Sequence, residues 1–175
     1  ESVRTTELIE NLLTLARADA GKAALERREI DLAPIVREAS QQGEKLAHAK
    51  SIGFRAHVPD TPVHTLGDAS ALRRLLLIVI DNAVKYTQEG EITVRLSTSN
   101  GHAQVEVSDT GVGISKSDLP RVFERFYRAD KSRNRESGGA GLGLSIAKWI
   151  ADVHRGAIEA RSESEGGSTF VITLP

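Results

Sequence analysis

Residues 91–109, EITVRLSTSNGHAQVEVSD, are the segment that most restricts the fold of this 175-residue chain. Strand-forming runs lie on both sides of Asn100-Gly101, a dipeptide typical of two-residue β-hairpin turns. We therefore predict an antiparallel hairpin. In its second strand apolar and polar residues alternate, so one face of the sheet is expected to be buried under helices.

The other segments are a mixture of helix-like and strand-like patterns without an internal repeat. Helices are expected for residues 1–20, from near Pro34 onward, for 72–87 with a cap at Asp68 or Ser70, and around 142–153. Extended segments are expected at 28–32 and 51–59, and a second hairpin at 156–175. The predicted fold is an α/β two-layer sandwich, in which a mixed, largely antiparallel sheet has helices packed on one face and is preceded by one helix.

Composition excludes several classes of function. The net charge is −1 and aromatic residues make up 4%, which argues against a nucleic-acid surface. The chain has no cysteine, so disulfides, zinc thiolates and thiol nucleophiles are excluded. No apolar run reaches about 18 residues, so we expect no membrane span. Because the sequence starts at Glu1 and has no methionine, we expect it to be part of a longer protein.

The carboxylate of Asp109 breaks the apolar pattern of the second hairpin strand. Ala103, Val105 and Val107 alternate with polar residues, and the same period places Asp109 on their inward face. A buried carboxylate needs a donor, which is either the following turn or a ligand such as the amino group of a base. Glycines at 111 and 113 favour the ligand, because they let the backbone approach a planar group closely.

A second break in the pattern lies in the most apolar helix. Ile78, Asn82, Lys85 and Tyr86 follow helical spacing and share one face. Asn82 is either a tolerated polar residue near a helix end or part of a site. In the second interpretation it offers an amide oxygen to a metal, Lys85 an ammonium to a phosphate, and Tyr86 a ring to cover a base.

A third unusual segment is the polar stretch that leads into a glycine-rich turn. Residues 121–136 carry six basic and three acidic side chains, which suits either a solvated loop or a lid over a polyanion. The turn that follows contains Gly139, Gly141 and Gly143 at the start of a helix, where free amides favour phosphate. It lacks the Gly-Lys-Ser/Thr of a P-loop and the glycine spacing of a dinucleotide fingerprint.

Four segments together resemble the boxes of a known family. LLIVIDNAVKYT is similar to the N box, DTGVGI to the first glycine box, RVFERFYR to the F box and GGAGLGLSI to the second glycine box. These boxes, in this order, are found in the catalytic ATP-binding domain of bacterial sensor histidine kinases, within the gyrase, Hsp90, histidine kinase and MutL superfamily. The resemblance covers roughly residues 27–175. LIENLLTLARADAG resembles the end of the dimerisation helix that precedes this domain.

The resemblance implies a Bergerat-type fold and a role for each residue of the site. Asp109 would bind the adenine amino group, Tyr86 would cover the base, and Asn82 would hold Mg²⁺. Lys85 and Arg128 would meet the phosphates of ATP, and Phe123 with Phe126 would anchor the lid. The resemblance further implies ATP-binding positions at Gly111, Gly113, Ile114, Gly139, Gly141, Leu142, Gly143 and Thr169. Strand parity nevertheless places Thr169 on the face opposite Phe170 and Ile172.

Two departures from the family pattern affect the expected function. Ile78 stands where many members have a second asparagine and where the ATPases of the superfamily have a glutamate that activates water. Metal binding would then depend on Asn82 and water, and rapid ATP hydrolysis is not expected. None of the five histidines lies in the family's His-Glu/Asp acceptor motif, which is expected before Glu1; the last, His154, is expected to make structural contacts.

The resemblance implies the donor domain of a two-component histidine kinase that uses ATP and Mg²⁺. The chain would then consist of two parts: residues 1–21 would be the end of the dimerisation helix, and residues 22–175 would be the catalytic domain. The expected partners are its own dimerisation domain with the acceptor histidine and a response regulator downstream, and the N-terminal apolar stripe suits a homodimer. The domain would be cytoplasmic in a membrane-anchored parent. The alternatives are a nucleotide-binding scaffold without transfer activity and an anti-sigma-factor serine kinase, which the N-terminal helix disfavours.

Overall fold

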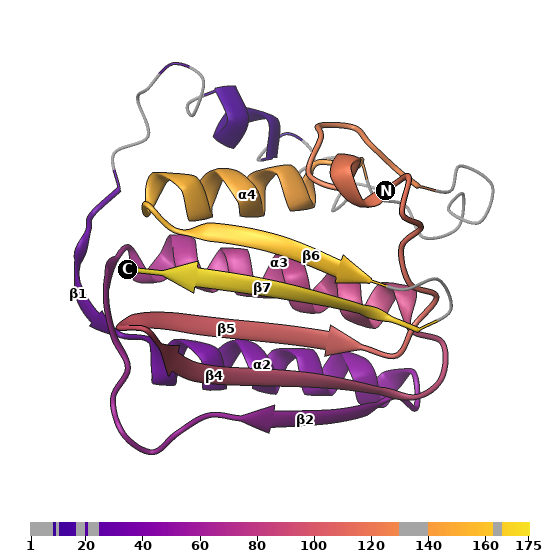
Figure 1. Ribbon diagram of the computed structural model, residues 1–175, viewed down its shortest axis with the longest axis horizontal. Coiled ribbons are helices and arrows are strands. Elements are labelled where there is room, and N and C mark those ends of the chain that lie inside the picture. The colour runs from indigo at the N-terminus through magenta and orange to yellow at the C-terminus, as the bar shows by residue number, and fades with distance from the viewer. Residues whose placement is uncertain (1–8, 10, 17–19, 21–24, 130–139, 163–165) are drawn as a thin grey trace.

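The computed structural model describes residues 9, 11–16, 20, 25–129, 140–162 and 166–175. Its main sheet is mixed, with strand order β2-β4-β5-β7-β6 (Figure 1). Only the β2–β4 pair is parallel, and the other three pairs are antiparallel. The strands are β2 (Gly53–His57), β4 (Glu91–Ser99), β5 (His102–Asp109), β7 (Ser168–Leu174) and β6 (Ala157–Ser162).

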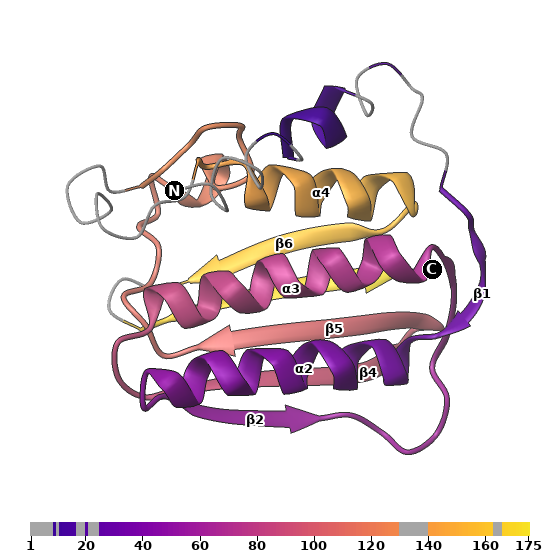
Figure 2. The same cartoon turned by 180° about the vertical axis from the view of Figure 1, so that it is seen from behind.

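Three helices lie on one face of this sheet, in the order α2, α3, α4 (Figure 2). They are α2 (Leu32–Ala49), α3 (Ala69–Tyr86) and α4 (Gly143–Val153). Their apolar stripes and the inward residues of β4, β5 and β7 form one core, in which Ile80, Ile92 and Ile172 are almost fully buried. The predicted two-layer sandwich is therefore confirmed. None of the described helices combines the length and apolar content that a bilayer crossing requires.

Local sequence signals fix several boundaries as predicted. Asn100 and Gly101 have φ values of 52° and 79°, the left-handed geometry of a type I′ hairpin turn. Asp68, and not Ser70, caps α3, because its Oδ1 accepts from the Ala71 N–H at 2.9 Å. Asp31 caps α2 in the same way, so this helix begins before Pro34, which lies in its first turn.

A small two-stranded sheet was not predicted. β1 (Arg28–Asp31) pairs antiparallel with β3 (His64–Gly67), and only β1 coincides with an expected extended segment. Asp31 stabilises this region because its Oδ1 also accepts from the Val63 N–H at 3.0 Å. Four residues are too few to carry a clear alternation, so β3 is defined by its partner and not by its own sequence.

His154 makes the structural contacts expected of it. Its side chain is buried at the end of α4, where Nδ1 donates to the Ile150 carbonyl at 2.7 Å. Nε2 accepts from the backbone N–H of Asp68 at 3.0 Å, which assigns the neutral tautomer from the hydrogen-bond network. The imidazole therefore joins the end of α4 to the start of α3.

Helical residues 11–16 contact α3 through Arg74, whose guanidinium donates to Asn11 Oδ1 at 2.9 Å and to Thr14 Oγ1 at 3.0 Å. Leu15 joins the core, whereas Leu12 and Leu13 remain exposed. Within helical residues 11–16, the predicted apolar stripe is thus only partly buried. The stripe predicted from the sequence comprises Leu8, Ile9, Leu12, Leu13, Leu15 and Ala16, and Gly21 is expected to end the helix; Leu8 and Gly21 lie outside the described residues.

Candidate nucleotide-binding site

The site lies at the end of the sheet where β5 stops and α2 and α3 also end (Figure 1). The turn after β5 contacts the last residue of α3, since the Val112 N–H donates to the Tyr86 carbonyl at 3.3 Å. A Cβ at Gly111 would lie only 2.3 Å from this carbonyl oxygen, so the turn can pack here only with glycine. The turn that follows Asp109 is thereby held against the end of α3, which carries Tyr86.

Asp109 is buried, as the strand period predicted, with 8% of its surface exposed. Its Oδ1 accepts from the backbone N–H of Gly111 at 2.8 Å and from that of Ser168 at 3.3 Å. Burial raises the pKa of this carboxyl, and the two hydrogen bonds oppose that rise. Asp109 thus caps its own turn through Oδ1, and no donor in the described part of the chain bonds its Oδ2.

The residue beside Asp109 is Ser168 and not Thr169. Asp109 and Ser168 are directly opposite in the β5–β7 ladder, and Ser168 is also buried. Thr169 pairs with Ser108, and their hydroxyls lie 2.9 Å apart on the other face of the sheet. The structure therefore does not bring the Thr169 side chain to the site. Strand parity was the signal that identified this, and the same count leads to Ser168.

The rest of the first glycine turn is attached to β6 and β7. Gly113 has φ of 71°, and the following N–H, that of Ile114, donates to the Ser162 hydroxyl at 2.6 Å. Ser162 in turn donates to the Gly167 carbonyl. The Ile114 side chain packs against the core, so in this structure the residue supports the turn.

Lys85 and Tyr86 lie at the end of α3 as the spacing predicted, with Asn82 one turn earlier. The Lys85 Nζ lies 5.4 Å from the centroid of the Tyr86 ring, and Tyr86 as a residue is 37% exposed. Burial is the main cause that lowers the pKa of Lys85, and the nearby positive charge of Arg128 lowers it further. Asp81 acts in the opposite direction, since its negative charge raises the pKa of Lys85.

The start of α4 packs closely against α3 at the position of the family departure. A Cβ at Gly143 would lie 3.3 Å from Ile78 Cγ2, so the apolar side chain supports the helix start. Leu142 is the N-cap of α4 and is buried, which leaves only its backbone to face a ligand. No side chain caps this helix end. Gly139, also predicted here, lies outside the described residues.

Gly141 and Phe126 join the two ends of the predicted lid. The Phe126 N–H donates to the Gly141 carbonyl at 2.9 Å, and both residues have positive φ, 62° and 72°. Phe123 anchors this region as predicted, with its ring edge-to-face against Phe170 at 6.3 Å. The Phe126 side chain does not anchor the lid as predicted, because Phe126 is 62% exposed. Phe126 contributes through the hydrogen bond from its backbone N–H to Gly141. Residues 130–139 of the lid lie outside the described part.

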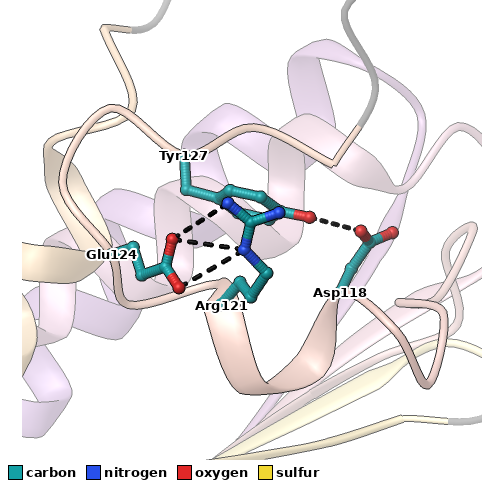
Figure 3. A network of polar contacts seen from close by, with 4 residues as sticks. All are labelled: Asp118, Arg121, Glu124 and Tyr127. Atoms are coloured by element: carbon teal, nitrogen blue, oxygen red, sulfur yellow. Dashed lines mark hydrogen bonds and ion pairs between the residues drawn. The ribbon is translucent and has the colours of Figure 1, made fainter.

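A polar network precedes Arg128 (Figure 3). The Arg121 guanidinium lies 4.2 Å from the centre of the Tyr127 ring and pairs with Glu124 at 3.2 Å. The Tyr127 hydroxyl donates to Asp118, which lowers the pKa of Asp118 and raises that of Tyr127. This network was not predicted; it joins η1 (Leu119–Arg121) and its N-cap residue Asp118 to Tyr127, the residue before Arg128.

Comparison with known proteins decides the family. Residues 67–175 match the family described as "Histidine kinase-, DNA gyrase B-, and HSP90-like ATPase". The chain belongs to this family. Within this ATPase family, it resembles the ATP-binding catalytic domains of sensor histidine kinases, as the four boxes predicted.

Relatives in this family include sensor histidine kinases from several bacteria. The chain is 35% identical over 176 residues to the sensor-like histidine kinase SenX3 of Mycolicibacterium smegmatis, covering 100% of the chain and 46% of SenX3. It is 38% identical over 176 residues to the sensor histidine kinase CusS of Escherichia coli, covering 100% of the chain and 36% of CusS. The chain thus spans less than half the length of these two relatives.

Solved structures of the family share the fold. Full-length ShkA in complex with AMPPNP superposes with a TM-score of 0.82 at 28% identity, over 97% of this chain and 35% of ShkA. The mycobacterial sensor histidine kinase MprB superposes with a TM-score of 0.70 at 32% identity, over 85% of this chain and 97% of MprB. These similarities confirm the predicted fold class and the ATP-binding character of the domain.

Proposed function

We propose that this chain binds Mg²⁺–ATP and donates the γ-phosphoryl group to a histidine on a dimerisation helix outside the present sequence. The observation that carries the proposal is the position of Asp109. Its carboxylate is buried, and its Oδ1 is bonded within the turn, which leaves Oδ2 for the base. Asp109 also lies at the same end of the sheet as the last turn of α3, which carries Lys85 and Tyr86. An acceptor for the base is thus combined with cations for the phosphates.

Each ligand group of ATP has a matching residue in this proposal. Asp109 accepts from the adenine amino group, and the Tyr86 ring covers the base. Lys85 and Arg128 neutralise the phosphates, whose negative charge would oppose the lowering of the Lys85 pKa that burial and, second, Arg128 cause. Gly139, Gly141 and Gly143 allow the backbone to approach the phosphates. Catalysis then consists mainly of positioning the γ-phosphoryl group and neutralising its charge.

Mg²⁺ fits the site only together with the nucleotide. The described residues contain no group of three histidine, cysteine or carboxylate side chains that could hold a metal by themselves. Asn82 offers one amide oxygen, and Ile78 one turn earlier offers none. Mg²⁺ retains water readily and takes phosphate oxygens as ligands, so Asn82, phosphates and water form a suitable set. When bound, the ion would neutralise charge that develops on the phosphates.

The proposal extends to the arrangement of the parent protein. Residues 1–21 would be the end of the dimerisation helix, and 22–175 the catalytic domain. The acceptor would be the parent's own dimerisation domain, with a response regulator acting downstream. We place the domain in the cytoplasm, where ATP is available, and expect the parent to be membrane-anchored.

Transfer of labelled phosphate in trans tests the proposal. With Mg²⁺ and labelled ATP, the 175-residue chain alone should not label itself, because none of its histidines lies in an acceptor motif. A dimerisation domain with its histidine, added separately, should become labelled with an acid-labile, alkali-stable bond. The rate should be low, since separate chains lack the effective concentration of a tether. Free phosphate should appear slowly, since Ile78 cannot activate water.

Two results would contradict this function. Strong labelling of the isolated chain on one of its own histidines would overturn the donor role. Tight ATP binding without transfer to any supplied histidine domain would favour the nucleotide-binding scaffold, and an acid-stable bond would favour a serine kinase.

A further inference from the structure

Lys50 connects the C-terminal ends of α2 and α3. It is the C-cap residue of α2, and its Nζ donates to the backbone carbonyl of Val84 in α3 at 2.9 Å. The end of α2 holds it there, because Ser51 adopts φ of 59° and the Ile52 N–H donates to the Ala47 carbonyl at 2.9 Å. Lys50 is thus presented by a defined helix end and not by a loop.

The carbonyl that Lys50 contacts belongs to the turn that carries the proposed ligand residues. Val84 lies between Asn82 and Lys85, in the part of α3 whose carbonyls lack partners within the helix. The preceding carbonyl, that of Ala83, is satisfied inside α3 by the hydroxyl and the N–H of Thr87. The Val84 carbonyl instead accepts a hydrogen bond from Lys50 at the end of α2. The positive charge of Lys50 also interacts favourably with the negative end of the α3 dipole.

We propose that Lys50 is a positioning residue for nucleotide binding, which fixes the last turn of α3 and with it Asn82, Lys85 and Tyr86. This inference rests on the proposed function of the site. Lys50 contacts the Val84 carbonyl and not a proposed ligand side chain, so its effect on the nucleotide passes through the backbone of α3. Its charge also contributes to the lowered pKa of Lys85, although less than burial and Arg128 do.

The experiment compares ADP affinity, measured by calorimetry, with the melting temperature of each variant. Lys50→Met removes the donor and the charge, Lys50→Arg retains both, and Lys45→Met is the matched control. Lys45 is exposed on the same helix, and its side chain has no polar partner in the part of the chain that the structure describes. We expect Lys50→Met to bind ADP about threefold to tenfold more weakly, which is the effect of losing one hydrogen bond.

A role in positioning predicts more than weaker binding. Lys50→Arg should restore affinity to within about twofold, and Lys45→Met should match the parent. The defect of Lys50→Met should persist at about 1 M salt, where electrostatic screening acts within about 3 Å. All variants are to be compared below their melting transitions, so that unfolding does not contribute to the measured affinity.

Several outcomes would overturn the inference. Parental affinity in Lys50→Met would do so, as would a defect that disappears at high salt, since that would show a long-range charge effect. A defect that only follows a lowered melting temperature, and that Lys50→Arg does not repair, would also contradict positioning. If the parent itself binds no ADP, the proposed function fails and the inference with it; if the parent binds and Lys50→Met equals it, only the inference fails.

Discussion

The backbone N–H of Ser168 donates to Oδ1 of Asp109 at 3.3 Å, and the two residues are directly opposite each other in the β5–β7 ladder. Both are buried, so their side chains share the face of the sheet that the helices cover. Thr169 is turned to the opposite face, where its hydroxyl meets that of Ser108. The hydroxyl that shares the face of Asp109 in this ladder is therefore that of Ser168 and not that of Thr169.

Substitution of Ser168 should weaken nucleotide binding, whereas substitution of Thr169 should leave it unchanged. Ser168→Val should weaken ADP binding by about tenfold, because it replaces a hydroxyl beside the base-binding carboxylate. Thr169→Val removes a hydroxyl on the other face and should leave the affinity within about twofold of the parent. Calorimetric titration with ADP measures both. A larger loss in Thr169→Val than in Ser168→Val would show that the register does not determine the ligand contact.

Replacing the carboxylate of Asp109 should nearly abolish adenine-nucleotide binding. In Asp109→Asn the amide can direct its own donor at the amino group of the base. The lost charge-assisted bond and this mismatch should together cost about 2–4 kcal/mol. Calorimetry with ADP is again suitable, with Asp152→Asn as a control, since Asp152 is an exposed partner of Lys148. Affinity within about twofold of the parent would exclude Asp109 as the base acceptor.

The same substitution should make the nucleotide-free protein more stable at neutral pH. Burial raises the pKa of Asp109, so its contribution to stability is present below the unfolded-state pKa and is lost as pH rises through the folded-state pKa. Asp109→Asn removes the buried charge and should raise the melting temperature at pH 7. The difference in melting temperature between the variant and the parent should become smaller as the pH falls through the raised pKa of Asp109. An equal or lower melting temperature of the variant at neutral pH would contradict this explanation.

Measuring ADP affinity with and without Mg²⁺ distinguishes a metal-binding role of Asn82 from a purely structural one. Asn82→Ala should weaken ADP binding by about tenfold or more when Mg²⁺ is present, and only slightly in EDTA. The expected reason is that the side chain holds the ion and not the nucleotide directly. Parallel titrations with and without Mg²⁺ measure the difference. Equal weakening in both buffers would mean that Asn82 supports the structure of α3.

Two glycines with similar backbone geometry allow a matched test of the lid. Gly141 and Gly101 both have positive φ, 72° and 79°, so alanine should cost about 1–2 kcal/mol of backbone strain at either position. A Cβ at Gly141 would also lie 2.8 Å from the carbonyl carbon of Phe126, whereas at Gly101 it would meet nothing within 4 Å. Gly141→Ala should therefore weaken ADP binding, and Gly101→Ala should lower only the melting temperature. Equal ADP affinities in the two variants would contradict a role of the Phe126–Gly141 contact in binding.

The sequence by itself determined the features that depend on neighbours along the chain. Asn100-Gly101 selects the hairpin turn because both residues tolerate positive φ. The sequence offered Asp68 or Ser70 as the cap of α3, and the structure shows that the Asp68 carboxylate reaches the N–H three residues ahead. The two-residue period of β5 was enough to place Asp109 inside. Helical spacing likewise grouped Asn82, Lys85 and Tyr86.

Tertiary structure decided the features that depend on partners far apart in the sequence. β3 exists as a strand because β1 pairs with it, and β2 can run parallel to β4 because β3 and α3 lie between them in the chain and form a crossover connection. The β5–β7 register selected Ser168, and the parallel course of two helices brought Lys50 to Val84 (Figure 2). Local patterns specify backbone conformation and which face is apolar, whereas register and helix packing follow from filling one common core.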